Sequence, residues 1–171
     1  MKEGYGAHLL TKPETIHDMV RQVRNRVSEL YSVSVKIRLL DEDRYSSFFE
    51  KDFFNFHTNY SECILKYQIF ISRRTIELAR SLEAAGATFL TLHARTTQER
   101  HSPIHEDSLR EVCQSLRVPL VANGDVKSIE GATKLHADTG CKGEATTIAL
   151  RGIKFLDSGI SDRFVFSFFQ V

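Results

Sequence analysis

Three short runs of β-branched and aliphatic residues, each ending in polar groups, constrain the fold of this chain more than any other feature. They span 33–38, 89–95 and 118–125 and read VSVKIR, FLTLHAR and VPLVANGD. Stretches with helical spacing of apolar residues separate them. This alternation of strand and helix predicts a parallel sheet, whose strands end together at one edge. We therefore expect the polar groups of the three runs to converge there.

The spacing of apolar residues predicts four helices. We expect them over 15–27, from Arg73 to Gly86, over 109–116 and over 129–137. Gly86 suits the left-handed position that ends a helix, and Ser128 is a favourable N-cap for the last helix.

Repeated strand and helix units indicate an α/β fold, a partial (β/α)8 barrel of the TIM type with parallel strands. A complete barrel needs about 250 residues, whereas this chain has 171, so we expect an incomplete one. Two Phe-rich segments divide the chain. We predict a partial barrel over 1–153, interrupted by an inserted segment of low order over 44–72, and a divergent tail over 154–171. An intron translated in frame would explain 44–72, and so would a genuine lid or interaction loop.

Charge and cysteine content exclude several classes of protein. With 23 Lys and Arg against 22 Asp and Glu, the net charge of +1 does not by itself indicate nucleic acid binding. Cys63, Cys113 and Cys141 lie far apart in sequence and have neither a zinc-site spacing nor an even number for disulfides, so we expect no metal and a reducing compartment. We expect no signal peptide, no membrane span and a cytoplasmic location.

The polar residues at the strand ends are the candidate site. Lys36 has the chemistry to face an anionic ligand, or to pair with an interior carboxylate. His93 follows an apolar strand, where a structural hydrogen bond and a ligand contact are both open. Asn123, Gly124 and Asp125 precede the helix capped by Ser128, and backbone N–H groups at a helix N-terminus favour phosphate. The Asn-Gly-Asp triplet is also a common turn.

These strand ends and their flanking residues resemble the tRNA-dihydrouridine synthase family, most of all its eukaryotic, dihydrouridine synthase 4-like branch. The similarity covers about 1–43 and 73–143. The matching pieces are Glu3-Gly4-Tyr5-Gly6-Ala7, Val35-Lys36-Ile37-Arg38, Leu92-His93-Ala94-Arg95-Thr96, Gln98-Glu99-Arg100-His101 and Val121-Ala122-Asn123-Gly124-Asp125-Val126.

The resemblance implies an FMN enzyme that reduces uridine in the tRNA D-loop with NADPH as the reductant, while a cysteine donates a proton. It places Lys36 beside the flavin ring, where the ammonium stabilises the charge of the reduced flavin. It places His93 between flavin and uracil. The resemblance also implies that the ribityl and phosphate groups are held by Asn123, Gly124, Asp125, Arg151 and Gly152. Candidates for substrate contact are Arg38, Arg95 and Arg100, and rim ion pairs are an alternative for the first two.

The chain departs from the family in three respects. The family's catalytic cysteine precedes the Gly-Tyr-Gly-Ala piece and has no counterpart here, so we assign no catalytic residue and expect the chain to be inactive as encoded. We expect the segment 44–72 to be an insertion. The closing strand is the third departure, because extra residues over 143–147 put Arg151 out of register with the family's pattern. We also expect the helical tRNA-binding domain to be absent. The alternatives are another FMN barrel oxidoreductase and a non-catalytic RNA-binding or interaction fragment.

Overall fold

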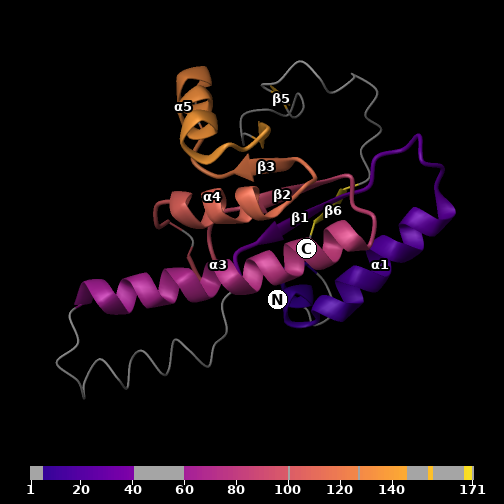
Figure 1. Ribbon diagram of the computed structural model, residues 1–171, viewed down its shortest axis with the longest axis horizontal. Coiled ribbons are helices and arrows are strands. Elements are labelled where there is room, and N and C mark those ends of the chain that lie inside the picture. Colours follow the sequence, from indigo (N-terminus) through magenta and orange to yellow (C-terminus); the bar gives the residue numbers. More distant parts are fainter. Residues whose placement is uncertain are drawn as a thin grey trace.

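The three predicted strands form the centre of one sheet in the computed structural model (Figure 1), which describes residues 6–40, 60–99, 101–126, 128–145, 154–155 and 168–170. The central strands are β1 (Ser34–Arg38), β2 (Phe89–His93) and β3 (Leu120–Asn123). They lie parallel and side by side. The predicted α/β class with parallel strands is confirmed.

The full strand order is β5-β4-β3-β2-β1-β6. Strand β4 (Gly143–Ala145) lies parallel to β3, and β6 (Phe168–Gln170) lies parallel to β1. Strand β5 (Lys154–Phe155) is antiparallel to β4. Both β5 and β6 belong to the segment 154–171, for which the sequence pattern predicted only a divergent tail. The absence of a regular apolar alternation there left no signal for either strand.

Helices and strands alternate along the chain, as they do in a (β/α)8 barrel. Helix α1 (Pro13–Arg26) follows a 3-10 turn, η1 (Gly6–Thr11). Helices α3 (Tyr60–Ala84), α4 (Glu106–Ser115) and α5 (Ile129–Thr139) alternate with the strands. Neighbours along the chain pack together, α1 on α3, α3 on α4 and α4 on α5 (Figure 1). This arrangement is typical of a section of a (β/α)8 barrel.

The core lies on one face of the sheet. Alternate strand residues are buried there because side chains along a strand point to opposite faces. The strand residues in this core are Val35, Ile37, Leu90, Leu92, Leu120 and Ala122, and they share one apolar cluster with Ile16, Leu82 and Leu109 from the helices. The opposite face carries the polar residues of the candidate site.

Helix α3 begins earlier than the sequence pattern predicted. The apolar periodicity indicated a start at Arg73, but the helix begins at Tyr60. Ile71 and Ser72, which precede the predicted start, are buried. Aromatic residues interrupt the apolar spacing before Arg73, and packing against the body of the fold overrides that weak local pattern. The rest of the segment predicted as inserted, 44–59, lies outside the described residues.

The ends of α5 follow the prediction. The Ser128 hydroxyl accepts a hydrogen bond from the Gly131 backbone N–H at 3.1 Å, which is the N-cap contact expected of a serine. Gly140 ends the helix in the left-handed region with φ +78°, and its N–H donates to the His136 carbonyl. These two caps fix where α5 starts after the Asn-Gly-Asp turn.

Candidate functional site

The carboxyl ends of β1, β2 and β3 bring Arg38, His93 and Asn123 into one row. His93 is the register partner of Arg38 on one side and of Asn123 on the other. Lys36 lies one row deeper, opposite Thr91. The two rows share one face of the sheet, because strand residues two positions apart point to the same side. The structure therefore brings together the strand-end residues that the sequence predicted would converge.

Lys36 is a half-buried cation beside an unpartnered hydroxyl. Burial lowers the pKa of its ammonium, and the positive charge of Arg38 lowers it further. Thr91, its register partner, is 2% exposed, and its hydroxyl has no hydrogen-bond partner among the described residues. Buried polar groups in folded proteins are nearly always hydrogen-bonded. An unpartnered hydroxyl next to a cation therefore indicates a polar ligand site.

His93 is held in its neutral form. Burial lowers its pKa to about 4, and the charges of Arg38, Arg95 and Lys36 contribute in the same direction, while Asp125 opposes them. The His93 Nε2 atom lies 3.4 Å from a terminal guanidinium nitrogen of Arg95. Because a guanidinium only donates, Nε2 is the acceptor and the ring proton is on Nδ1. At neutral pH the ring thus offers one N–H donor and no charge.

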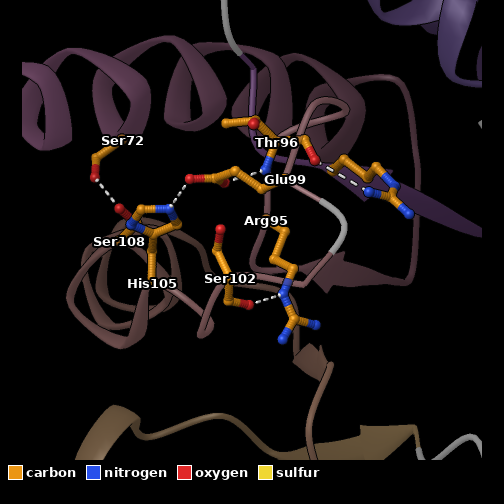
Figure 2. Close-up of polar contacts among 8 residues, drawn as sticks. Ser72, Arg95, Thr96, Glu99, Ser102, His105 and Ser108 are labelled. Atoms are coloured by element: carbon orange, nitrogen blue, oxygen red, sulfur yellow. Dashed lines mark hydrogen bonds and ion pairs between the residues drawn. The ribbon is translucent and has the colours of Figure 1, made fainter.

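Arg95 uses all of its guanidinium nitrogens to hold the site together. Its Nε donates to the Ser102 carbonyl (Figure 2), one terminal nitrogen faces His93, and the other forms an ion pair with the Asp125 carboxylate. The residue is 8% exposed. Arg95 was predicted as a substrate contact, with a rim ion pair as the alternative. The ion pair with Asp125 is present, and the three contacts use three of the five N–H groups of the guanidinium.

The Asn-Gly-Asp turn packs directly on the His93 ring. Gly124 has φ +122° and Asp125 has φ +56°, both in the left-handed region that favours glycine. A Cβ at Gly124 would lie 2.8 Å from Ile104 Cγ2 and 3.1 Å from His93 Cδ2. The glycine is therefore needed both for backbone conformation and for close approach. The turn places its backbone between β3 and the N-terminus of α5.

The loop from β2 to α4 is fixed by a second polar network. The Glu99 carboxylate accepts from the Thr96 backbone N–H at 2.8 Å and lies 2.7 Å from His105 Nε2 (Figure 2). Burial alone would raise the pKa of Glu99, but the Thr96 N–H and the His105 ring lower it below its ordinary value. Arg38 donates to the Thr96 carbonyl at 3.0 Å. The loop is thereby tied to the end of β1.

Sequence reasoning missed Thr91, the Glu99 and His105 pair, and the buried contact between the Ser72 and Ser108 hydroxyls at 2.9 Å. Thr91 had a detectable signal, because it alternates with His93 on the polar side of β2. The other contacts depend on the paths of loops and on how helices pack, and the local spacing of apolar residues does not predict either. The serine pair links α3 to α4 and depends on the packing of both helices.

A cavity of about 260 Å³ lies beside the Asn-Gly-Asp turn. Its walls come from the end of the β2–α4 loop, the turn itself and one side of α5. The lining residues are Pro103, Ile104, Glu106, Gly124, Asp125, Val126, Gly131, Lys134, Leu135 and Asp138. The lining combines apolar side chains with acidic and basic ones.

Three predicted site residues, Arg100, Arg151 and Gly152, lie outside the described residues. Within the part of the chain that the structure describes, no group of three or more His, Cys, Asp or Glu side chains is arranged to hold a metal ion. Among the same residues, no helix is long and apolar enough to cross a bilayer.

The lowered pKa of His93 predicts a loss of stability in mild acid. The unfolded chain binds a proton near pH 6.5, whereas folded His93 does so only near 4, so stability is full above about pH 6.5 and falls as the pH drops toward 4. Because the ring is half exposed, we expect a loss of about 1 to 2 kcal/mol. Urea unfolding at pH 7.5 and 4.5 measures it. The His93→Gln variant should lose this part of the pH dependence; an unchanged dependence in that variant would contradict the assignment.

Comparison with known proteins adds an independent observation. The sequence model of the dihydrouridine synthase (Dus) family matches residues 1–51 and 63–148. The residues left out, 52–62, fall inside the segment 44–72 that the sequence predicted as inserted.

Individual relatives agree with the family match. The tRNA-dihydrouridine(20a/20b) synthase-like proteins of Mus musculus and Homo sapiens are 40% and 36% identical over 144 residues, which is 84% of this chain and 36% of each relative. A tRNA-dihydrouridine(20a/20b) synthase of Schizosaccharomyces pombe is 32% identical over 144 residues, 84% of this chain and 35% of that protein. The chain thus spans about a third of the length of these relatives.

Proposed function

This chain belongs to the dihydrouridine synthase family, and we propose from that premise that it holds the FMN side of a tRNA-dihydrouridine synthase site. The observation that carries the proposal is the grouping of a half-buried cation, a neutral imidazole and a turn with two left-handed residues at one sheet edge. Each has a chemistry suited to one part of a flavin nucleotide. The substrate in this proposal is a uridine of the tRNA D-loop.

The residues present fit FMN in two independent ways. The buried hydroxyl of Thr91 lacks a partner among the described residues on the face that carries Lys36, so a polar ligand group there would satisfy it. At Gly124 the absence of a side chain lets the turn backbone pack directly against His93 and Ile104, so the turn is held at the edge of the sheet that carries His93. Backbone that approaches closely at a helix N-terminus is suited to a phosphate-bearing ligand.

Each residue has a defined task in the proposed site. Lys36 would face the flavin ring, where a cation with a lowered pKa and partial burial stabilises negative charge strongly. His93 would donate its Nδ1–H without adding a charge. Asn123, Gly124 and Asp125 would hold the ribityl and phosphate end, completed by Arg151 and Gly152. When bound, FMN supplies the redox chemistry of the reaction, with NADPH as the reductant.

Arg95 has a positioning role in this proposal. It fixes the His93 tautomer, anchors the turn through Asp125 and holds the loop through Ser102. In this proposal the residues that contact RNA are Arg38 and Arg100. Arg38 already joins the end of β1 to Thr96 at the rim of the site, and a cation there is well placed to meet a phosphate backbone.

We further propose that none of the three cysteines of this sequence is the proton donor. Cys141 lies just before β4, at the amino edge of the sheet and opposite the edge that carries His93. Cys113 lies in α4 and forms a hydrogen bond with Cys141, so it shares that location. Cys63 lies in the segment predicted as inserted. Without a general acid, uridine reduction loses about 100- to 10,000-fold in rate.

The test uses the purified 171-residue chain with unmodified tRNA, FMN and NADPH. We expect FMN to bind and dihydrouridine to form at least about 100-fold more slowly than with the full-length mouse relative assayed in parallel. A rate equal to that of the relative would overturn the proposed loss of the acid. Binding of tRNA without any binding of FMN would instead support a non-catalytic RNA-binding protein.

A further inference from the structure

Cys113 and Cys141 are far apart in sequence but adjacent in the fold. Cys113 lies near the end of α4, and Cys141 directly follows the left-handed Gly140 that ends α5. The two thiols share a hydrogen bond. A Cβ built on Gly140 would lie 3.9 Å from the Cys113 sulfur, which places that sulfur against the same turn. Both cysteines are reduced.

The backbone of Cys141 is fixed by neighbouring side chains. His136 donates from Nδ1 to the Cys141 carbonyl, and the Cys141 N–H donates to the Thr139 hydroxyl at 3.3 Å. Because the carbonyl and the N–H of Cys141 are both held, its backbone is fixed relative to the end of α5. Two sulfurs within hydrogen-bond reach of each other need little rearrangement to form a bond.

The two thiols differ in accessibility and ionisation. Cys113 is partly exposed, whereas Cys141 is fully buried. The hydrogen bond from Cys141 lowers the pKa of Cys113 to about 7; burial opposes this shift, and the nearby Lys142 and His136 add to it. The accessible sulfur is therefore the one with substantial thiolate at neutral pH. This is the combination expected of an attacking cysteine backed by a resolving one.

We propose that Cys113 and Cys141 form an oxidisable dithiol that a hydroperoxide converts into an intramolecular disulfide between α4 and the start of β4. The Cys113 thiolate attacks the peroxide, the O–O bond breaks, and a sulfenic acid and hydroxide or alkoxide result. The Cys141 thiol then attacks the sulfenic sulfur, and water leaves with its proton. Two thiols lose two electrons in total, and the hydroperoxide is reduced to water or an alcohol.

The bond would close a loop that contains β3, the Asn-Gly-Asp turn and α5. The site at the carboxyl ends of the strands and the dithiol at their amino edge are therefore connected through the same elements. Oxidation would restrict the unfolding of this part of the chain, because a cross-link removes conformations from the unfolded state. The inference does not depend on the proposed FMN site, since it rests on the thiols alone.

The direct test is peptide mapping after treatment of the reduced full-length chain with one equivalent of hydrogen peroxide. Trypsin releases Cys113 in the peptide 111–117 and Cys141 in the peptide 135–142, each with a single cysteine. We expect a disulfide-linked pair of these two peptides at low protein concentration under non-reducing conditions. Only mixed or intermolecular disulfides, or Cys113 oxidised without Cys141, would overturn the proposal.

Two variants separate the roles of the thiols. In Cys141→Ser, we expect Cys113 to stop at the sulfenic acid and to be captured by dimedone. As a matched control, Gln114→Cys in a Cys113→Ser background moves the thiol to the next, exposed position of α4, and we expect no linkage to Cys141. If the thiol introduced at position 114 formed as much disulfide with Cys141 as Cys113 does in the wild type, the pairing would not depend on the position of Cys113 and the proposal would be wrong.

A kinetic measurement checks the wild-type protein without any variant. At pH 7 we expect Cys113 to react with iodoacetamide several-fold faster than an ordinary thiol, because its lowered pKa raises the fraction of thiolate. A rate equal to that of an ordinary thiol would contradict the proposed attacking role. The rate is followed from the alkylated peptide 111–117.

Discussion

Replacing Arg95 with Met is expected to lower the free energy of unfolding by about 2 kcal/mol, because it leaves the Asp125 carboxylate without the guanidinium with which it pairs. The Arg95 side chain is 10% exposed and that of Asp125 is 47% exposed, which reduces the loss below that of a fully buried pair. The variant also leaves the Ser102 carbonyl without its donor. Denaturant unfolding followed by circular dichroism measures the change.

The exposed ion pair of α3 provides the control. Arg74 and Glu77 lie 3.4 Å apart with side chains 45% and 60% exposed, so Arg74→Met should change stability by less than about 1 kcal/mol. Arg95→Lys should not restore the wild-type value, since a lysine lacks the planar fork that reaches three acceptors. If Arg95→Met and Arg74→Met cost the same, the positioning role of Arg95 is wrong.

Replacing Gly124 with Ala should destabilise the chain by about 2 to 4 kcal/mol. An alanine is strained at φ +122°, and its Cβ would lie 2.8 Å from Ile104 and 3.1 Å from the His93 ring. We also expect FMN binding to weaken, because the turn and the ring must separate. Thermal unfolding and flavin titration of the same preparation measure both effects.

The matched control for Gly124 is the helical Gly131. A Cβ at Gly131 meets only the Ser128 hydroxyl oxygen at 3.5 Å, and no positive φ is required there. Gly131→Ala should therefore be neutral or stabilise α5 by up to about 1 kcal/mol. Opposite outcomes for the two substitutions would show that conformation and close approach, rather than flexibility in general, explain the requirement at Gly124. If Gly124→Ala left the stability of the chain unchanged, the claim that this turn requires a glycine would be wrong.

The central strands and most helices could be predicted because their signals are local. Val35 and Ile37 alternate with polar residues that point to the other face, and Ser128 and Gly140 act through contacts within a few residues. The early start of α3 and the edge strands β5 and β6 could not be predicted in this way. They depend on packing and pairing with distant parts of the chain, which no local period records.

The same distinction applies to the site. Parallel strands end at one edge, so the convergence of Lys36, His93 and Asn123 follows from topology once the strands are recognised. The contacts of Arg95 and the adjacency of Cys113 and Cys141 do not follow, because they require the paths of the loops. The insertion hypothesis for 44–72 and the roles of Arg100, Arg151 and Gly152 stay predictions.

The central claim is that this chain binds FMN at the carboxyl ends of its strands. Titration of FMN with the purified chain, followed by flavin fluorescence, tests it most directly. We expect saturable quenching that weakens about 10- to 100-fold in Lys36→Met, as the loss of one charge-assisted interaction predicts, and that is unchanged in Lys142→Met at the opposite edge. Absence of FMN binding, or equal affinity in the wild type and Lys36→Met, would contradict the account.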